Sequence, residues 1–173
     1  MLFQGENASL RLDVVNYEFP PDGGAPDSDD RNWLVLRCTW IDEEGDITKD
    51  SNSCLLTYEL QEMTAGLKVL NAGIKSSYES CFSEPYFLLA ADAEEGGFRF
   101  QVSFFLPNPM AGDDTATITC HITREDMAAL SAYLTNVCPR SPDRHCDGPS
   151  TTDTHSCSPL GLPCVRCVAT TVL

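Results

Sequence analysis

Six histidine and cysteine residues near the C-terminus are the side chains of this chain best suited to bind a metal ion. They are His145, Cys146, His155, Cys157, Cys164 and Cys167. Thiolate and imidazole groups are the ligands that zinc prefers, and two of these cysteines form a CxxC pair. The remaining spacings match no common zinc finger, however. We therefore expect free thiols and no metal or cofactor, while zinc binding and disulfides stay open as alternatives.

The rest of the chain gives little support for catalysis. It holds no glycine-rich phosphate-binding motif, no HExxH and no GxSxG. His121 is the only histidine before residue 139, and its neighbour Cys120 should point to the opposite face of a strand. A Cys–His dyad needs both side chains within hydrogen-bond reach. We expect no enzyme; a pocket lined by two carboxylates, or by His121 with a polar partner, would reopen that question.

Acidic residues gather in segments that have the composition of loops. The clusters are Asp27, Asp29 and Asp30; Asp42, Glu43, Glu44 and Asp46; Asp92, Glu94 and Glu95; and Asp113 and Asp114. Most such clusters are solvated turns. A calcium site in the first cluster would lack the twelve-residue ligand pattern with its closing glutamate.

The charge balance indicates which partners the chain can attract. The 173 residues include 11 Lys and Arg against 26 Asp and Glu, a net charge of −15. Nucleic acids and anionic membranes would repel such a surface, whereas a basic protein would be attracted to it. Solubility alone is the other explanation of the acidity. The longest apolar run, residues 86–91, is far shorter than the ~20 residues of a membrane helix, and the first residues lack a signal-peptide pattern. We expect a cytoplasmic protein.

Composition changes after Cys138. Residues 1–138 hold 8 Lys and Arg and 23 Asp and Glu, so the entire net charge lies there. Residues 139–173 are neutral, rich in proline and cysteine, and without clear periodicity. This pattern predicts one ordered domain over 1–138 and an irregular, disordered tail over 139–173.

Alternating apolar residues predict several strands in the ordered part. They lie near residues 10–19, 34–40, 86–91, 98–104 and 116–122, with a bulge near Val14 and weaker candidates near Ile47 and over 78–83. Gly96 and Gly97 mark a hairpin turn.

Two amphipathic helices follow from apolar residues at three- and four-residue spacing. The first begins near Thr57, a plausible N-cap, and stops at Gly73. The second begins at Thr123, with Asp126 completing an imperfect capping box. Strands with one apolar face need a cover. The sequence therefore predicts an α+β fold, in which a mostly antiparallel sheet of about six to seven strands is covered by the two helices.

Certain segments give a more specific indication. The runs LDVVNYEFP, DDRNWLVLRCTW, CLLTYEL at a helix start and FSEP follow one another over residues 5–138. In this order the chain resembles the WapI-type immunity proteins of bacterial polymorphic-toxin and contact-dependent inhibition systems. The family more often has Trp where this chain has Tyr58, and the residues after EP, Tyr86 and Phe87, also depart from it.

The resemblance implies a binding function. Such a protein occupies its cognate toxin in the producing cell, and the toxins are often nucleases with basic surfaces. We therefore expect a non-enzymatic acidic protein that neutralises a basic toxin domain by direct contact; the alternative is a general interaction or structural module. The expected partner-binding residues are exposed acids and aromatic anchors. They are Asp27, Asp29, Asp30, Trp33, Asp42, Glu43, Glu44, Asp46 and Tyr86. For Trp33 a position in the core is the favoured alternative.

Overall fold

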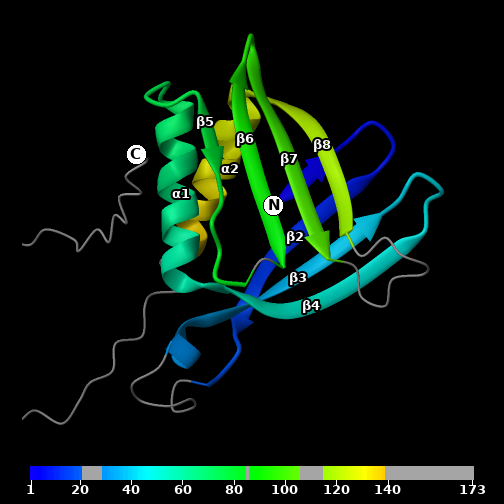
Figure 1. Ribbon diagram of the computed structural model, residues 1–173, viewed down its shortest axis with the longest axis vertical. Coiled ribbons are helices and arrows are strands. Elements are labelled where there is room, and N and C mark those ends of the chain that lie inside the picture. Colours follow the sequence, from blue (N-terminus) through cyan, green and yellow to red (C-terminus); the bar gives the residue numbers. More distant parts are fainter. Residues whose placement is uncertain (21–28, 85, 106–114, 139–173) are drawn as a thin grey trace, which may run out of the picture.

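The computed structural model describes residues 1–20, 29–84, 86–105 and 115–138 (Figure 1). In chain order the elements are β1 (Leu2–Gln4), β2 (Ser9–Tyr17), a 3-10 turn (Asp29–Asn32), β3 (Trp33–Ile41), β4 (Ile47–Leu56), α1 (Thr57–Asn71), β5 (Ser77–Glu79), β6 (Phe87–Glu94), β7 (Gly97–Phe105), β8 (Thr115–Thr123) and α2 (Arg124–Val137). Asp27 and the cysteine-rich tail lie outside the described residues, so the expectations for them stay predictions.

The strands form two antiparallel sheets of four, in the orders β1-β2-β3-β4 and β5-β6-β7-β8. Each sheet is a meander followed by one helix, so the chain repeats a ββββα unit. The α+β class with antiparallel strands and two helices is confirmed. The strands form two sheets rather than the expected single one: β4 and β5, which lie on either side of α1 in the chain, do not pair, and β5 starts a new meander.

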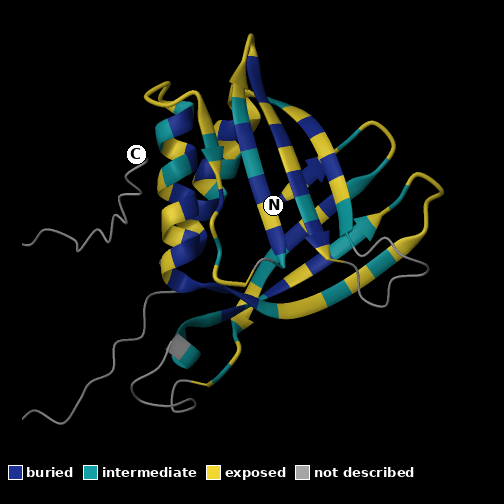
Figure 2. Ribbon diagram, in the orientation of Figure 1, coloured by how far each residue is buried: buried dark blue, intermediate teal, exposed yellow. Residues whose placement is uncertain are grey.

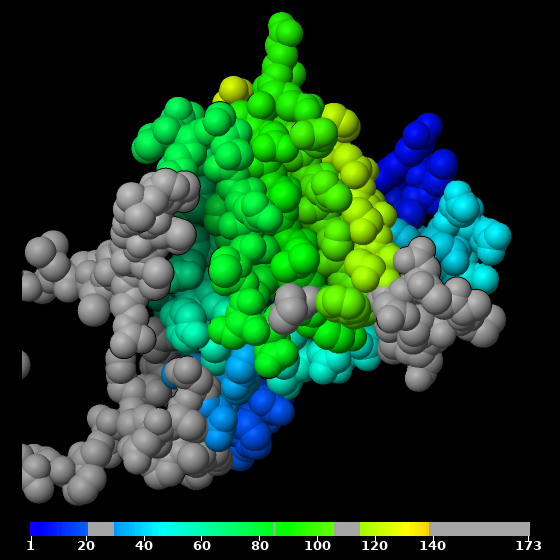
Figure 3. Space-filling view, viewed as in Figure 1, coloured from blue at the N-terminus to red at the C-terminus, as the bar shows by residue number. Residues whose placement is uncertain are grey.

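The two sheets cross, and α1 and α2 lie beside them (Figure 1). Both sheets and the apolar faces of both helices contribute buried residues to one core. Alternate residues of each strand point inward, which produces the striped burial of Figure 2. The second sheet supplies four almost fully buried aromatic side chains, Phe87, Phe98, Phe100 and Phe104. Ring contacts join the sheets: Phe3 and Phe100 have centroids 5.9 Å apart, and Trp40 and Phe104 5.5 Å. In Figure 3 the outer face of the second sheet forms the front of the molecule.

The first helix begins at Thr57, as its sequence predicts, but Thr57 is not its N-cap. Leu56 occupies that position, and its N–H donates to Oε2 of Glu59 at 2.8 Å. Oε1 of the same carboxylate accepts the N–H of Ser83 at 2.5 Å. Glu59 is only 2% exposed. A buried acid in the first turn thus caps the helix and holds the connection to the second sheet against it, where the helix dipole favours negative charge.

Several local predictions are confirmed. The register of β2 against β3 shifts between Val14 and Asn16, which is the expected bulge. Gly96 has φ +85° in the turn between β6 and β7. Thr123 caps α2, and its side chain and that of Asp126 form the predicted capping box. The weak strand near Ile47 is in fact β4, the longest strand described, with ten residues.

Candidate partner-binding site

The turn between β3 and β4 carries four of the predicted partner-binding residues. This acidic turn, residues 42–46, is fixed by Asp42, whose Oδ1 accepts the N–H groups of Glu44 at 3.0 Å and Asp46 at 2.8 Å. Gly45 adopts φ +87°, a conformation that favours glycine, and donates its N–H to the Asp42 carbonyl at 3.2 Å. Asp42 is therefore a structural residue of the turn, and Glu43, Glu44 and Asp46 are presented to solvent.

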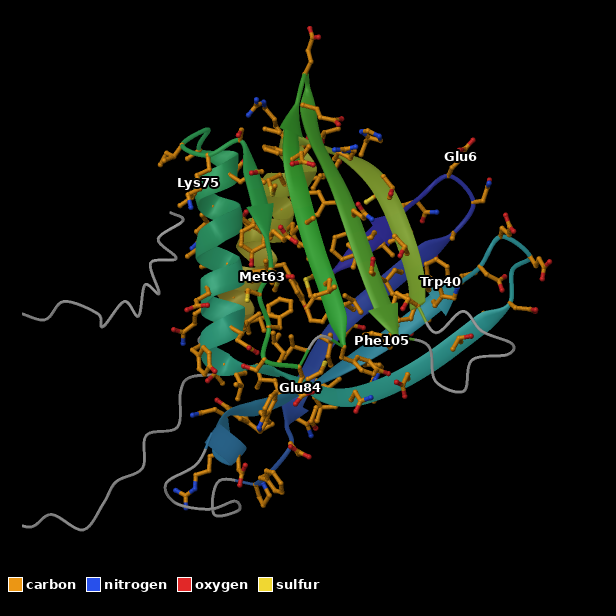
Figure 4. All side chains as sticks on the ribbon, in the orientation of Figure 1. Glu6, Trp40, Met63, Lys75, Glu84 and Phe105 are labelled. Atoms are coloured by element: carbon orange, nitrogen blue, oxygen red, sulfur yellow. The ribbon has the colours of Figure 1, made fainter. Side chains whose placement is uncertain are left out.

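A groove lies between the acidic turn and the turn that joins β1 to β2. Its volume is about 320 Å³, and its lining includes Glu6, Trp40, Asp42, Glu43 and Thr119. We call it the acidic groove. Its lining contains no Lys or Arg. Figure 4 shows Glu6 at the tip of its turn and Trp40 near the end of β3, at the same end of the molecule. Carboxylates around a half-buried indole suit a Lys or Arg side chain, through both ion pairing and cation–π contact.

Two exposed isoleucines lie directly behind the acidic turn. Ile41 and Ile47 are cross-strand partners and are 37% and 60% exposed. Protein interfaces commonly combine an apolar centre with a polar rim. The acids and this apolar pair together have the composition of a protein-contact surface.

The other predicted residues lie elsewhere. Asp29, Asp30 and Trp33 lie at the end of β3 that is opposite to the acidic turn. β3 has nine residues, so its two ends are roughly 30 Å apart. Trp33 is half-buried, and its carbonyl accepts the N–H of Glu18 at 2.9 Å. Tyr86 is half-buried and packs against the core, just before β6. The structure thus brings one of the two predicted clusters to the groove and does not unite it with the other.

Sequence reasoning missed Glu6, Trp40 and the two isoleucines. Glu6 is more than thirty residues from the acidic turn in the chain. Only the pairing of β2 with β3 brings the two turns to one end of the sheet, since Ser9 lies opposite Ile41. The alternation over residues 34–40 placed Trp40 on the inner face, without showing that it borders a groove.

Among the residues described, a single cluster of acidic side chains has the geometry to hold a cation. The side chains of Asp42, Glu44 and Asp46 have oxygens within 4.8 Å of one another. Glu44 and Asp46 are exposed, and Asp42 already accepts two backbone hydrogen bonds. These bonds account for the convergence of the carboxylates without a metal ion.

His121 lies on the outer face of β8, and Cys120 points inward, as predicted. Its Nδ1 is 3.0 Å from Glu94, and the same glutamate is 3.2 Å from Arg99. A cavity of about 510 Å³ between β1 and α2 borders His121 and Asp126. The Asp126 carboxylate accepts the N–H and hydroxyl of Thr123 in the helix cap. His121 and Asp126 thus both have structural partners.

The buried cysteines are poor nucleophiles. Burial, with a smaller contribution from Asp50, raises the pKa of the Cys38 thiol to about 12. Burial and nearby carboxylates, Glu59 first, likewise raise the pKa of Cys54 to about 12. A thiol must lose its proton to attack a substrate or bind a metal. These two side chains therefore stay protonated at neutral pH and serve the core.

Fold and surface together define a two-sheet α+β domain with an acidic groove at one end. The chain belongs to the WapI-like immunity protein family, whose model matches residues 1–142.

Other comparisons give the following results. No curated protein matches the chain. A crystal structure of WHY3 from Arabidopsis thaliana is similar, with 16% sequence identity, a TM-score of 0.43, and coverage of 82% of this chain and 86% of that one. Within the described residues, no helix is both long and apolar enough to span a membrane.

Proposed function

We propose that this protein neutralises a cognate bacterial toxin by direct contact, without catalysis, in the cytoplasm of the producing cell. The observation that carries the proposal is membership of the WapI-like immunity family over residues 1–142, which supports a toxin-immunity function in general. In this proposal the toxin domain is basic. A nuclease is the expected kind of toxin, because a nuclease has a basic surface.

The acidic groove supports the choice of a basic partner. Glu6, Asp42 and Glu43 line it without a neighbouring Lys or Arg, and Trp40 offers an aromatic surface inside it. A protruding basic side chain of the toxin would exchange its hydration for carboxylates and an indole face. The apolar pair Ile41 and Ile47 would be covered in the same contact.

Co-expression tests the proposal. The chain is produced together with the C-terminal domain of the toxin encoded directly upstream, and growth is compared with that of cells producing the toxin domain alone. We expect growth to be restored, and an immunity protein of unrelated specificity serves as the control. Killing that persists despite abundant folded chain would contradict the proposal.

Stoichiometry separates inhibition from catalysis. Purified toxin domain is titrated with the chain while residual toxin activity is measured. A contact inhibitor abolishes activity at one equivalent per toxin, because each complex removes one toxin molecule. An enzyme that modifies the toxin would do so at far smaller amounts, and that outcome would refute a non-catalytic function.

A further inference from the structure

The edge of the first sheet formed by β4 is open in the described structure. β4 is last in the order β1-β2-β3-β4 and pairs only with β3. It has ten residues, whereas the edge strands β1 and β5 have three each. β8, the other edge of the second sheet, lies beside β1. In Figure 1 β4 runs along the lower right boundary of the described molecule.

The hydrogen bonds of the acidic turn determine which groups of β4 are unpaired. Asp42 donates its N–H to the Asp46 carbonyl at 3.1 Å, so these two residues form a hydrogen-bonded pair. Hydrogen-bonded pairs alternate along an antiparallel ladder. The backbone groups of Thr48, Asp50 and Asn52 therefore face β3. Those of Lys49, Ser51 and Ser53 face away from it, and no described segment other than β3 forms a backbone hydrogen bond with β4.

Most side chains along this edge are polar and accessible. Ile47, Lys49, Ser51 and Asn52 are exposed, and Asp50 is half-buried. Figure 2 shows the strand exposed toward the acidic turn and buried next to α1. Asp50 forms no ion pair with the described residues. A long edge strand with accessible backbone groups is a template for strand addition.

We propose that an extended segment of the toxin pairs with β4 and adds a fifth strand to the first sheet, with a Lys or Arg opposite Asp50. This inference rests on the proposed function and specifies its binding mode. A cation opposite Asp50 would lie on the face of the sheet that Asp50 shares and Lys49 does not, because neighbouring residues of a strand point to opposite faces. The adjoining acidic turn also attracts cations, so the segment is basic. A second copy of this chain fits less well, since it would bring the same acidic turn and net charge to the contact.

Hydrogen exchange of the wild-type protein gives the most specific readout. In the free protein the amides of Lys49, Ser51 and Ser53 should exchange quickly. In the complex with the toxin domain they should be protected at least about ten-fold, because each donates to the added strand. The amides of Asp50 and Asn52, which face β3, should be slower in both states. Unchanged exchange at residues 49, 51 and 53 in a formed complex would overturn the inference while leaving the proposed function intact.

A proline series provides the binding test. Ser51→Pro removes an outward N–H without breaking the β3–β4 ladder, and should raise the Kd for the toxin domain about ten-fold or more. Ser77→Pro is the matched control, because the bonds of Ser76 and Ser80 to β6 place the Ser77 N–H on the outer side of β5. Ser51→Thr retains the N–H, and both controls should bind like the wild type. Folding is checked by thermal unfolding, and if Ser51→Pro fails to fold, the exchange experiment decides.

The two proposals fail in different ways. A chain that does not bind the toxin domain at all refutes the proposed function. A chain that binds equally well with Ser51→Pro, when that variant is folded, refutes strand addition alone. Alternating protection of residues 49, 51 and 53 that appears without toxin and rises with protein concentration would identify a second copy as the occupant and overturn the inference.

Discussion

At the scale of single residues, the inner face of the first sheet keeps two thiols un-ionised. Cys38 and Cys54 are 4% and 2% exposed, and the pKa of each is raised to about 12, mainly by burial. Asp50 contributes to both shifts, and Glu59 contributes to that of Cys54. A neutral thiol in this position packs as a small apolar side chain. The carboxylates nearby therefore oppose thiolate chemistry rather than promote it.

These shifts predict a pH dependence of stability. The pKa of the Cys54 thiol is 9.0 without the folded environment and about 12 in the folded protein, so the unfolded state loses its proton first. The stabilisation is complete below a pH of 9.0 and is lost as the pH rises toward about 12. We expect Cys54→Ala to show a smaller decrease of the unfolding free energy between pH 8 and 11 than the wild type. Urea unfolding in the presence of a reductant measures this decrease for both proteins. Equal decreases would show that the Cys54 thiol is not responsible for the pH dependence.

At the scale of elements, α1 contains a glycine for a packing reason. A Cβ at Gly66 would lie 2.3 Å from Cε2 and 2.4 Å from Cδ2 of Tyr78. The ring of Tyr78 in β5 thus packs on the helix where the glycine leaves space. The helical propensity lost at this position, about 1 kcal/mol relative to alanine, permits β5 to approach α1.

The contact between Gly66 and Tyr78 predicts that Gly66→Ala changes the stability in opposite directions when Tyr78 is present and when it is replaced. Gly66→Ala in the wild type should destabilise the protein by about 1–3 kcal/mol, because the added methyl group overlaps the Tyr78 ring. In a Tyr78→Ala background the same substitution should stabilise it by about 1 kcal/mol, since only helix propensity remains. A double-mutant cycle by chemical denaturation measures both effects. Equal effects in the two backgrounds would show that the ring does not restrict this position.

At the scale of the whole molecule, the charges are unevenly arranged. Glu6 and the acidic turn lie at one end of the first sheet without a cation in the groove lining. The outer face of the same sheet carries Arg11, Arg37 and Lys49 on adjacent strands, where Asp13 forms an ion pair with Arg11. Within the first sheet, a basic partner is therefore attracted toward the acidic groove rather than toward this outer face.

Charge reversal tests this direction of approach. Glu43→Lys with Glu44→Lys should lower the association rate constant for the toxin domain about ten-fold at low salt and make it less salt-dependent. The control is Glu62→Lys combined with Glu125→Lys, which gives the same net charge on the exposed surfaces of α1 and α2. Stopped-flow kinetics at several salt concentrations compares them. If both pairs slow association equally, net charge rather than the acidic groove is responsible.

The sequence by itself determined the local structure. Apolar alternation located the strands, three- and four-residue spacing located both helices, and Gly96 and Thr123 were identified by their conformational and hydrogen-bonding preferences. These features depend on neighbours within a few residues, so a one-dimensional pattern records them. The β4 strand was underestimated because its polar edge, TKDSNS, lacks the apolar alternation that marks a covered strand.

Only the tertiary structure decided how these elements combine. It divided the strands into two crossing sheets, made Glu59 a link between α1 and the β5–β6 connection, and joined Glu6 and Trp40 to the acidic turn. It also separated the two predicted acidic clusters by the length of β3. Contacts between residues that are distant in the chain depend on packing and strand order. Residue types and short spacings, which describe only near neighbours, do not specify these contacts.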